Sequence, residues 1–327
     1  MKTYMSPIDR RDMLGLLAVG AAGPVFAQAD APSGPIRLVV SFAPGGSADG
    51  VMRMVAKEAS ASLKIPMIVD NKPGGSGIVA AESVLQARPD GNALLLASTT
   101  SIMHPALGVK TRYDFMNDFA PLAHVVSAAN VVVVSAKTGI TNLRDLKAAA
   151  KAQPKDFAFG SPGVGSSGHV QGVLLGRQAG VELTHVAYRG NALLLNDLIA
   201  GTINVGLLDT MTLAPFARDK ALAFVAVTGP KRVQTLPSVP TLAELGHPKF
   251  EMLAWQAIFA PAGVPAPVQA TLGRAIAEAL KVPAISEWIA NNGAVRVDKV
   301  GKEFAAMVRE DAASWTAIIK EEDIKIT

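Results

Sequence analysis

Segments typical of β-strands alternate with segments typical of α-helices along most of the chain. Short apolar runs are followed, again and again, by stretches with apolar residues at helical spacing. This alternation predicts an α/β fold with helices covering mainly parallel sheets. Val131 to Val134 form an unbroken valine run, which is typical of a strand buried on both faces. The expected strands span 36–42, 67–70, 93–98, 130–135, 157–160, 183–188, 203–208, 222–228 and 254–260. The expected helices span 47–63, 76–87, 141–152, 166–179, 190–200, 212–219, 265–280, 283–291 and 301–320.

A glycine-rich loop joins the first expected strand to the first expected helix. It reads S-F-A-P-G-G-S-A-D-G over residues 41–50. Gly45 and Gly46 accept backbone angles that other residues resist, and Ser47 is a favourable N-cap. The free N–H groups of a helix N-terminus attract anions. The loop is therefore either a site for a phosphate or carboxylate or a plain strand-to-helix turn.

Three further loops resemble this first one in composition. They read N-K-P-G-G-S-G over 71–77, A-S-T-T-S over 97–101 and G-S-P-G-V-G-S-S-G-H over 160–169. Ligands of open α/β sheets bind beyond the carboxyl ends of the strands, where several of these hydroxyls are expected. Neutral donors of this kind suit an anion that is held mainly by hydrogen bonds.

The stretch Gly163 to Gly168 also fits the dinucleotide-binding pattern G-x-G-x-x-G. Glu182 lies near the spacing expected for the acidic residue of such a site. It precedes the next expected strand, however, whereas that acid should end the strand. The loop is also richer in hydroxyls than a pyrophosphate turn requires. An exported oxidoreductase that binds a nucleotide here remains an alternative.

Three single residues have two readings each. His169 either donates to a ligand or fixes the loop at the start of a helix. Asp209 either binds a ligand group or caps the helix that begins near Thr212. Arg189 either holds a second carboxylate or is simply exposed. The five histidines show no paired metal spacing, so we expect no metal site.

The composition and the N-terminus indicate an exported protein. There is no cysteine among the 327 residues, which excludes disulfides, cysteine–zinc sites and cysteine nucleophiles. Arg10 and Arg11 precede an apolar stretch over 13–22, and small residues surround Ala27, as in a signal peptide. The pair of arginines resembles a twin-arginine signal, although a Sec signal also fits. We expect a periplasmic protein cleaved near Ala27, with two domains and no membrane span.

The charge of the chain argues against one class of partner. The net charge is +4, without a basic run, so nucleic acid is not an expected partner.

A set of motifs resembles the Bug receptors, the periplasmic solute-binding proteins of tripartite tricarboxylate transporters. The likeness covers essentially the whole mature chain, in order. The motifs are P-G-G-S-A-D at 44–49 with Arg53, D-N-K-P-G-G-S-G at 70–77, R-P-D-G at 88–91, H-P-A-L at 104–107, F-G-S-P-G-V-G-S-S-G-H at 159–169, H-V-A-Y-R-G at 185–190, A-V-T at 226–228, L-P-S-V-P-T at 236–241 and A-P-A-G at 260–263.

The resemblance implies a two-domain periplasmic binding protein of type II, a Venus flytrap that closes on a small carboxylate. One domain would comprise 28–133 plus 251–327 and the other 134–250, joined by crossing hinge strands. The protein would be a monomeric receptor, not an enzyme, without cofactor or metal, and would deliver its ligand to integral-membrane transporter subunits. The ligand would be a di- or tricarboxylate, an aromatic acid or an amino acid.

The same resemblance implies which residues contact the ligand. The carboxylate end would be held by Gly45, Gly46, Ser47, Ser161, Gly165 and Ser166. The variable part of the ligand would face Ser98, Thr99, Thr100 and Asp209. The remaining expected contacts are Ala43, Pro44, Asp49, Ser167 and His169.

Several residues depart from the family pattern near the expected pocket. Ser41 and Ala43 stand where prolines are usual, and His104 stands where asparagine is common. The other departures are Phe159, Ala187 and Thr210. They leave the glycine turn and the serine cluster in place but bear on which acid is bound. A receptor that senses its ligand without a transporter is a further alternative.

Overall fold

The protein is described here by a computed structural model covering residues 31–326, except 154–156 and 182. The expected signal peptide, 1–27, lies outside the described residues. The strands are β1 Ile36–Val40, β2 Met67–Asn71, β3 Ala93–Ser98, β4 Phe119–Ala128, β5 Asn130–Ser135, β6 Ala158–Ser161, β7 Thr184–Ala187, β8 Val205–Asp209, β9 Leu222–Val227, β10 Ala254–Pro261 and β11 Ala294–Val295. The helices are α2 Ser47–Leu63, α3 Ile78–Leu85, α4 Thr100–Met103, α5 Phe115–Asp118, α6 Leu143–Ala152, α7 Ser167–Ala179, α8 Asn191–Ala200, α9 Thr210–Leu213, α10 Ala266–Lys281, α11 Pro283–Asn291 and α12 Gly301–Glu321.

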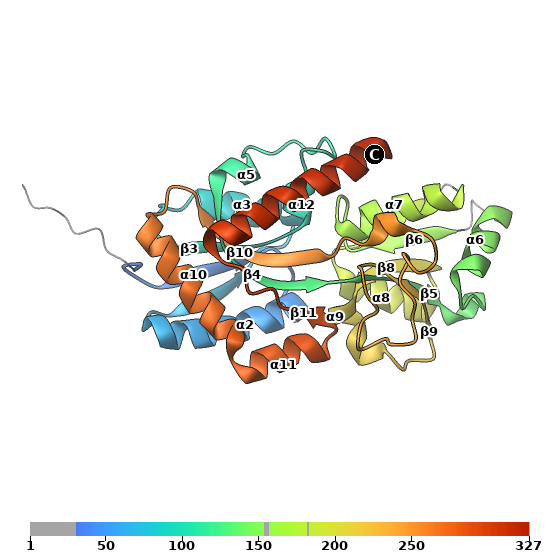
Figure 1. The fold of residues 1–327 in the computed structure, drawn as a ribbon, viewed down its shortest axis with the longest axis horizontal. Coiled ribbons are helices and arrows are strands. Elements are labelled where there is room, and N and C mark those ends of the chain that lie inside the picture. The colour runs from blue at the N-terminus through green and yellow to red at the C-terminus, as the bar shows by residue number, and fades with distance from the viewer. Residues whose placement is uncertain (1–30, 154–156, 182, 327) are drawn as a thin grey trace, which may run out of the picture.

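The described strands form two sheets, which lie at the two ends of the molecule in Figure 1. The first has the order β11-β4-β10-β3-β1-β2 and the second β7-β6-β8-β5-β9. We call each sheet with the helices packed on it a lobe. The chain enters the second lobe at Ala129, between β4 and β5, and returns along residues 228–253 to β10.

Both sheets are mixed, which confirms the expected α/β class. Four of the six strands of the first sheet run in one direction, and four of the five in the second. Four of the antiparallel pairs arise because the reversed strands β10 and β5 are inserted between strands of the common direction. The fifth is made by β11, which is also reversed and lies at the edge of the first sheet beside β4. β5 and β10 each come directly after a crossing between the lobes. The chain therefore reverses its direction where it passes from one sheet to the other.

One long strand, β4, was missed by the sequence analysis. Pro121 interrupts its apolar run, and proline in such a run argues against a central strand. Most of β4 is in fact nearly an edge, because its outer neighbour β11 pairs only with Ser127 and Ala128. Pro121 therefore breaks no ladder on that side, and the pairing with β10 shifts register between Ile258 and Phe259.

Smaller differences concern the ends of strands and helices. The short helices α4 and α5 and the strand β11 were not expected, whereas each expected strand and helix has a counterpart. The helix expected at 212–219 instead starts at Thr210 and continues as a 3₁₀ turn over Ala214–Phe216. Asp209 sets this earlier start by accepting a hydrogen bond from the backbone N–H of Thr212.

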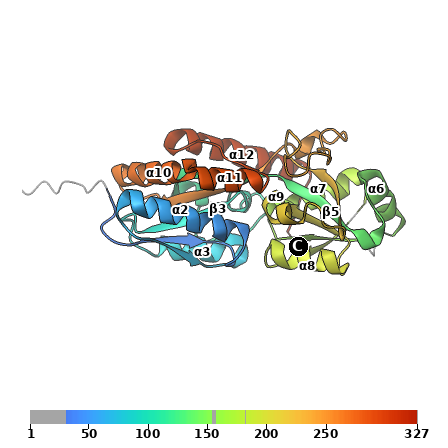
Figure 2. The ribbon, with the colours of Figure 1, turned by 90° about the horizontal axis from the view of Figure 1, so that it is seen from below.

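Each sheet of the molecule is covered on both faces. In the first lobe, Leu38 and Val40 of β1 pack with α2, α10 and α11, while Val39 packs with α3 and α12. In the second lobe, Val131 and Val133 pack with α8 on one face. The other face of that sheet packs with α6 and α7. Figure 1 shows α2 and α11 below the strands of the first sheet and α3 and α12 above them, and Figure 2 views the molecule from below, from the side of α2 and α11. Burial on both faces explains the continuous valine run.

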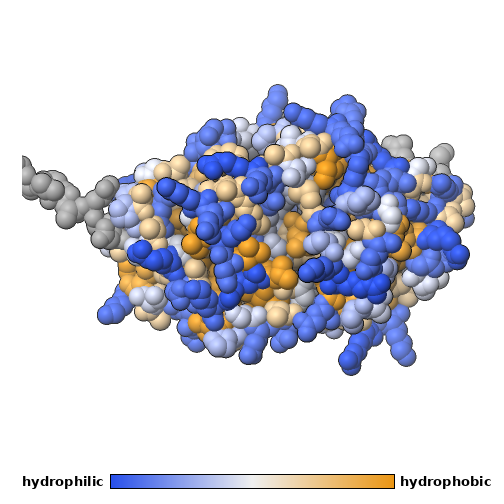
Figure 3. All heavy atoms as spheres, viewed as in Figure 1, coloured by the Kyte–Doolittle hydropathy of each residue, from blue (hydrophilic) through white to orange (hydrophobic). Residues whose placement is uncertain are grey.

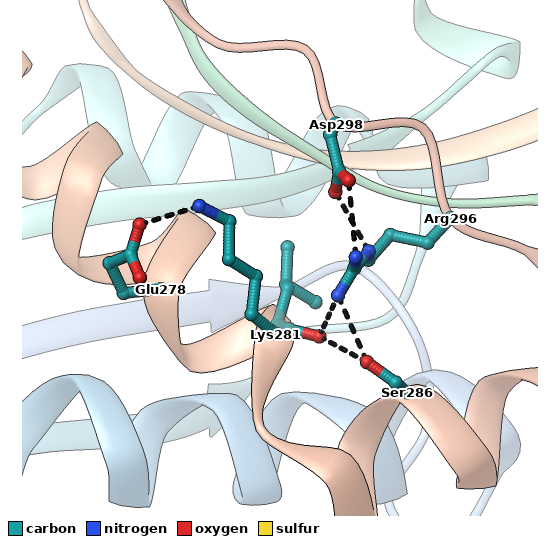
Figure 4. Close-up of polar contacts among 6 residues, drawn as sticks. Glu278, Lys281, Ser286, Arg296 and Asp298 are labelled. Carbon is teal, nitrogen blue, oxygen red and sulfur yellow. Dashed lines mark hydrogen bonds and ion pairs between the residues drawn. The ribbon is translucent and has the colours of Figure 1, made fainter.

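Arg296 fixes the junction of α10 and α11 in the first lobe. Its guanidinium donates to the carbonyl of Leu280 at 2.7 Å and to the hydroxyl of Ser286 at 2.9 Å. An ion pair with Asp298 at 2.7 Å completes the arrangement (Figure 4). The last turn of α10, the first turn of α11 and the segment after β11 are therefore held together. A carbonyl at a helix C-terminus that lacks an intrahelical partner is satisfied in this way.

Polar residues cover most of the face seen in Figure 3, with small apolar areas between them. Nine large apolar side chains are exposed among the described residues. They are Ile68, Val79, Met116, Val164, Val186, Leu193, Leu245, Val295 and Val300. No described helix combines the length and the apolar character needed to cross a bilayer.

Candidate ligand-binding site

The loop over residues 41–50 forms a tight turn that ends at the N-terminus of α2. Gly45 has a φ of +84°, in the left-handed region that glycine tolerates best. The N-cap is Gly46 and not Ser47, which is the first residue of the helix. The expected cap was therefore wrong by one position. The hydroxyl of Ser47 makes no hydrogen bond with the described residues and is free for a ligand, and Ala43, Pro44, Gly45 and Gly46 are exposed.

Asp49 holds this loop from within. Its carboxylate accepts from the backbone N–H of Gly45 at 3.0 Å and from the amide of Asn71 at 3.0 Å, and pairs with Arg53. Burial alone raises the pKa of Asp49, but the hydrogen bonds from Arg53, Gly45 and Asn71 outweigh it, and the pKa is lowered. Asp49 is thus a charged, fully engaged support for the turn.

The loop over residues 97–101 is attached to strand β10. The hydroxyl of Thr99 accepts from the backbone N–H of Trp255 at 2.7 Å, and the N–H of Thr99 donates to the Trp255 carbonyl at 3.1 Å. Thr99 and Thr100 are buried, and Ser98 is half-buried. Thr99 therefore joins the end of β3 to the start of β10, just after the return crossing.

The loop over residues 160–169 is organised around Ser161, which is 0% exposed. The Ser161 hydroxyl donates to the carbonyl of Gly163 at 3.0 Å and lies 2.7 Å from Nε2 of His185. Since a hydroxyl has one proton, Nε2 of His185 is the donor in that contact. Ser166 caps α7 by accepting from the N–H of His169 at 3.2 Å.

His169 fixes the loop through its ring. Its Nδ1 accepts from the backbone N–H of Gly165 at 3.0 Å, where φ is +74°. The ring stacks on His185 with centroids 3.7 Å apart and planes within 12°. Burial lowers the pKa of both histidines to about 4, so both rings are neutral near pH 7. The reading in which His169 fixes the loop is thus present in the structure.

Asp209 is the N-cap of α9. One carboxylate oxygen accepts from the N–H of Thr212 at 2.7 Å, and the other accepts from the side-chain amide of Asn191. Burial raises the pKa of Asp209, and these hydrogen bonds act in the opposite direction. The capping reading is thus present in the structure. Arg189 is exposed and forms no ion pair with the described residues.

Direct contacts bring the four loops together between the lobes. The hydroxyl of Ser76 donates to the carbonyl of Val164 in the other lobe at 2.6 Å. The amide of Asn71 donates to the carbonyl of Phe42 at 3.1 Å. Gly77 lies beside Ser41 and Ser101, since a Cβ at this position would come 3.6 Å from Cβ of Ser41 and 4.0 Å from the hydroxyl of Ser101. The loop over 71–77 is therefore bonded to the loops over 41–50 and 160–169 and lies next to the loop over 97–101.

His104 and the C-terminal tail add to the same region. A Cβ at Gly165 would lie 3.1 Å from Cδ1 of Ile326, 3.4 Å from Leu107 and 4.0 Å from Cδ2 of His104. His104 is 3% exposed, and its Nδ1 has no partner among the described residues. The loop over 160–169 of the second lobe is thus packed against residues of the first.

Sequence reasoning missed Asn71, Ser76 and His185 as parts of this site, because they appeared only as letters within longer motifs. The signal for Ser76 was its place among glycines at 74–77, since Ser76 itself has a φ of +52°. His185 and Asn71 follow from pairing, because β7 and β2 bring them beside β6 and β1. That placement requires the sheet order, which a local motif does not contain.

Two other features lie away from these loops. An open hollow at the surface is lined by Lys57, Ser60, Lys64 and Met67, at the end of α2. No described group of three or more histidine, aspartate or glutamate side chains is placed to hold a metal ion.

Comparisons with known proteins identify the family. The model of the tripartite tricarboxylate transporter family receptor matches residues 51–324. BugT of Bordetella pertussis is 29% identical over 313 residues, which cover 95% of this chain and 96% of BugT. The structure of the periplasmic binding protein BugD superposes with a TM-score of 0.84 at 28% identity, covering 90% of this chain and 99% of BugD.

Two similar structures contain a ligand. MatC of Rhodopseudomonas palustris, with bound malate, has a TM-score of 0.82 and 26% identity over 88% of this chain and 99% of that one. Rpa4515 of R. palustris, with adipate, has a TM-score of 0.84 and 28% identity over 90% of this chain and 98% of that one. The chain therefore belongs to the tripartite tricarboxylate transporter receptors, the Bug-type periplasmic solute-binding proteins.

Proposed function

We propose that the protein captures a small dicarboxylate between its lobes and delivers it to the membrane subunits of a tripartite transporter. The observation that carries this proposal is that two hydroxyl-rich loops, one at the start of α2 and one at the start of α7, are both bonded to the loop over 71–77. In that loop the Asn71 amide donates to the carbonyl of Phe42 at 3.1 Å, and the Ser76 hydroxyl donates to the carbonyl of Val164 at 2.6 Å. Each loop presents the N-terminus of a long helix, where N–H groups favour an anion.

The chemistry of these loops favours a carboxylate held by neutral donors. The free hydroxyl of Ser47 and the N–H groups of the first turns of α2 and α7 are such donors. Asp49 and Asp209 accept hydrogen bonds from the protein itself, and Asp49 takes the N–H of Gly45, so the hydroxyl of Ser47 is the side-chain donor left open at the first loop. The relatives with malate and adipate support a ligand with two carboxylates.

The site residues expected from the sequence divide into two proposed roles. Gly45, Gly46, Ser47, Gly165 and Ser166 contact the ligand. Structural support of those contacts comes from Asp49, Thr99, Ser161, Ser167 and His169, because their polar atoms bond other parts of the protein. Ser98 and Thr100 remain proposed contacts for the rest of the ligand.

The two lobes correspond to the proposed domains, 28–133 plus 251–327 and 134–250. Closure would rotate one about the crossings at Ala129 and at residues 228–253. Binding shifts such an equilibrium only if closure adds contacts that the open form lacks. The contact between Ser76 and Val164 is one such contact between lobes.

The proposal makes the protein a non-catalytic, monomeric receptor of the periplasm, exported by the signal peptide at 1–27. The loop at 163–168 supports the dinucleotide alternative less well than the receptor proposal. A Cβ at Gly168 would approach the Leu207 carbonyl to 2.7 Å, so a glycine at this position allows α7 to pack closely on β8.

The proposal is tested on the mature protein purified without refolding. Native mass spectrometry is expected to show a retained acid, or an empty protein that binds malate or adipate in calorimetry. Ser47→Ala should weaken that binding, whereas Ser60→Ala, at the far end of α2, should not. A retained dinucleotide, or nicotinamide or flavin absorbance, would contradict the receptor proposal.

A further inference from the structure

A buried polar network surrounds the two crossings between the lobes. Asn130, the first residue after the first crossing, is 3% exposed. Its backbone N–H donates to the hydroxyl of Thr228 at 2.9 Å, and its carbonyl accepts from the N–H of Thr228 at 2.8 Å. Thr228 begins the second crossing, so these bonds tie the two crossings together side by side.

The side chain of Asn130 reaches the start of α7. Its amide donates to the hydroxyl of Ser167 at 3.0 Å and to Oε1 of Gln171 at 2.7 Å. Ser167 follows Ser166, which caps α7 at the end of the loop over 160–169. Both N–H bonds of the Asn130 amide are therefore used to hold the first turns of α7 against the crossings.

Gln171 extends the network to the return crossing. It is 2% exposed, and its Nε2 donates to the carbonyl of Met252 at 3.4 Å. A few residues on, the backbone of Trp255 exchanges hydrogen bonds with Thr99 in the first lobe. The short segment 252–255 is thus bonded at one end by α7 of the second lobe and at the other by the hydroxyl loop of the first.

We infer that Asn130, Gln171 and Thr99 are positioning residues that couple the ligand loops of the two lobes through the segment 252–255. This inference rests on the proposed function, since it names how that site and its hinge act together. A buried polar group is costly without a partner, so the network prefers one arrangement of loops and crossings. A ligand that orders the loop at 160–169 thereby biases the hinge, and the loop at 97–101 responds.

Three substitutions separate coupling from simple packing. Gln171→Met removes both bonds of Gln171 at similar volume, whereas Gln171→Glu keeps the acceptor for Asn130 and loses the donor to Met252. Thr99→Val removes the acceptor for Trp255 without changing shape. Ser60→Ala is the control, because Ser60 bonds the Ala56 carbonyl and the Met67 N–H far from the crossings.

The first readout is hydrogen exchange of the unliganded full chain. Gln171→Met should raise exchange at the amides of Thr99 and Trp255 about fivefold or more, although these lie at the other end of the segment from Met252. Thr99→Val should do the same at His169 and Val170, at the start of α7. Gln171→Glu should resemble Gln171→Met at Trp255 but preserve protection near Asn130. Ser60→Ala should change none of these amides.

The second readout is a double-mutant cycle on the Kd for adipate or malate. Thr99→Val and Gln171→Met should combine non-additively by threefold or more, because both act through one segment. Exchange that rises only in the mutated lobe, or an additive cycle, would overturn the inference while leaving the receptor function intact. Coupled exchange in a protein that binds no carboxylate would leave the inference standing and refute the proposed function.

Discussion

The hydroxyl of Ser76 donates to the carbonyl of Val164 at 2.6 Å, and this single bond joins the loops of two separate sheets. Ser76 makes it from a left-handed backbone conformation, with a φ of +52°, which costs an ordinary residue about 1–2 kcal/mol. The strain is confined to a residue that contacts the other lobe. The left-handed backbone at Ser76 therefore places its hydroxyl within hydrogen-bonding distance of the second lobe.

Replacement of Ser76 separates that bond from the strain. Ser76→Ala and Ser76→Gly both lose the hydrogen bond, worth about 0.5–1.5 kcal/mol, and should weaken ligand binding about equally. Ser76→Gly also relieves the strain, so urea unfolding should show it to be about 1 kcal/mol more stable than Ser76→Ala. Equal stability of the two variants, or unchanged Kd in both, would contradict this role.

Ser47→Ala should affect ligand binding but not folding. The Ser47 hydroxyl has no partner among the described residues, so its loss leaves the folded protein intact. A hydrogen bond to a carboxylate contributes about 1–3 kcal/mol, which predicts that extent of weakening in calorimetry. An unchanged Kd would remove Ser47 from the site.

Ser166→Ala and Ser166→Asp test the second loop in a different way. Ser166 caps α7, so alanine should cost about 1 kcal/mol of stability as well as binding. Aspartate is an equally good cap but places a negative charge beside the expected carboxylate. Ser166→Asp should therefore melt near the wild-type temperature and yet bind no acid. Binding by this variant would show that the anion lies elsewhere.

Stability should fall on acidification because four histidines are buried in the neutral form. Burial lowers the pKa of His104 and of His124 from 6.5 to about 4, as it does for His169 and His185. Between these values the unfolded chain binds protons that the folded protein does not, so stability is lost as pH falls from 6.5 towards 4. Each histidine contributes a slope of about 1.4 kcal/mol per pH unit in that range. Urea unfolding at several pH values should show His104→Asn with a shallower slope, and an unchanged slope would contradict the assignment.

Much of the fold was predictable because its information is local. The apolar alternation located the strand Asn130–Ser135 and the helix Ala266–Lys281 to within about a residue, since burial on both sheet faces imposes the pattern. The strand Phe119–Ala128 was hidden by Pro121, which is acceptable only because its neighbour Ala294–Val295 is so short. That tolerance depends on sheet order and not on nearby sequence.

The candidate site was predictable as a set of loops but not as a set of roles. Glycine and serine motifs identified the loops at 41–50 and 160–169 by composition. Asp49 was expected to contact the ligand, and Asp209 either to bind a ligand group or to cap a helix. Their oxygens prove to be used by Gly45, Asn71 and Thr212. Such partners come from other strands and helices, so a single motif cannot assign them.

The central claim is that a dicarboxylate binds between the lobes. A thermal-shift titration of the mature protein with malate, adipate and uncharged dimethyl adipate tests it most directly, alongside Ser166→Asp. A ligand that binds only the folded state adds about 2.7 kcal/mol at a hundred times its Kd. We predict that one free dicarboxylate raises the melting temperature of the wild type, while neither the ester nor the Ser166→Asp variant shows a shift. A rise with the ester, an equal rise in Ser166→Asp, or no rise with any carboxylate would contradict the account.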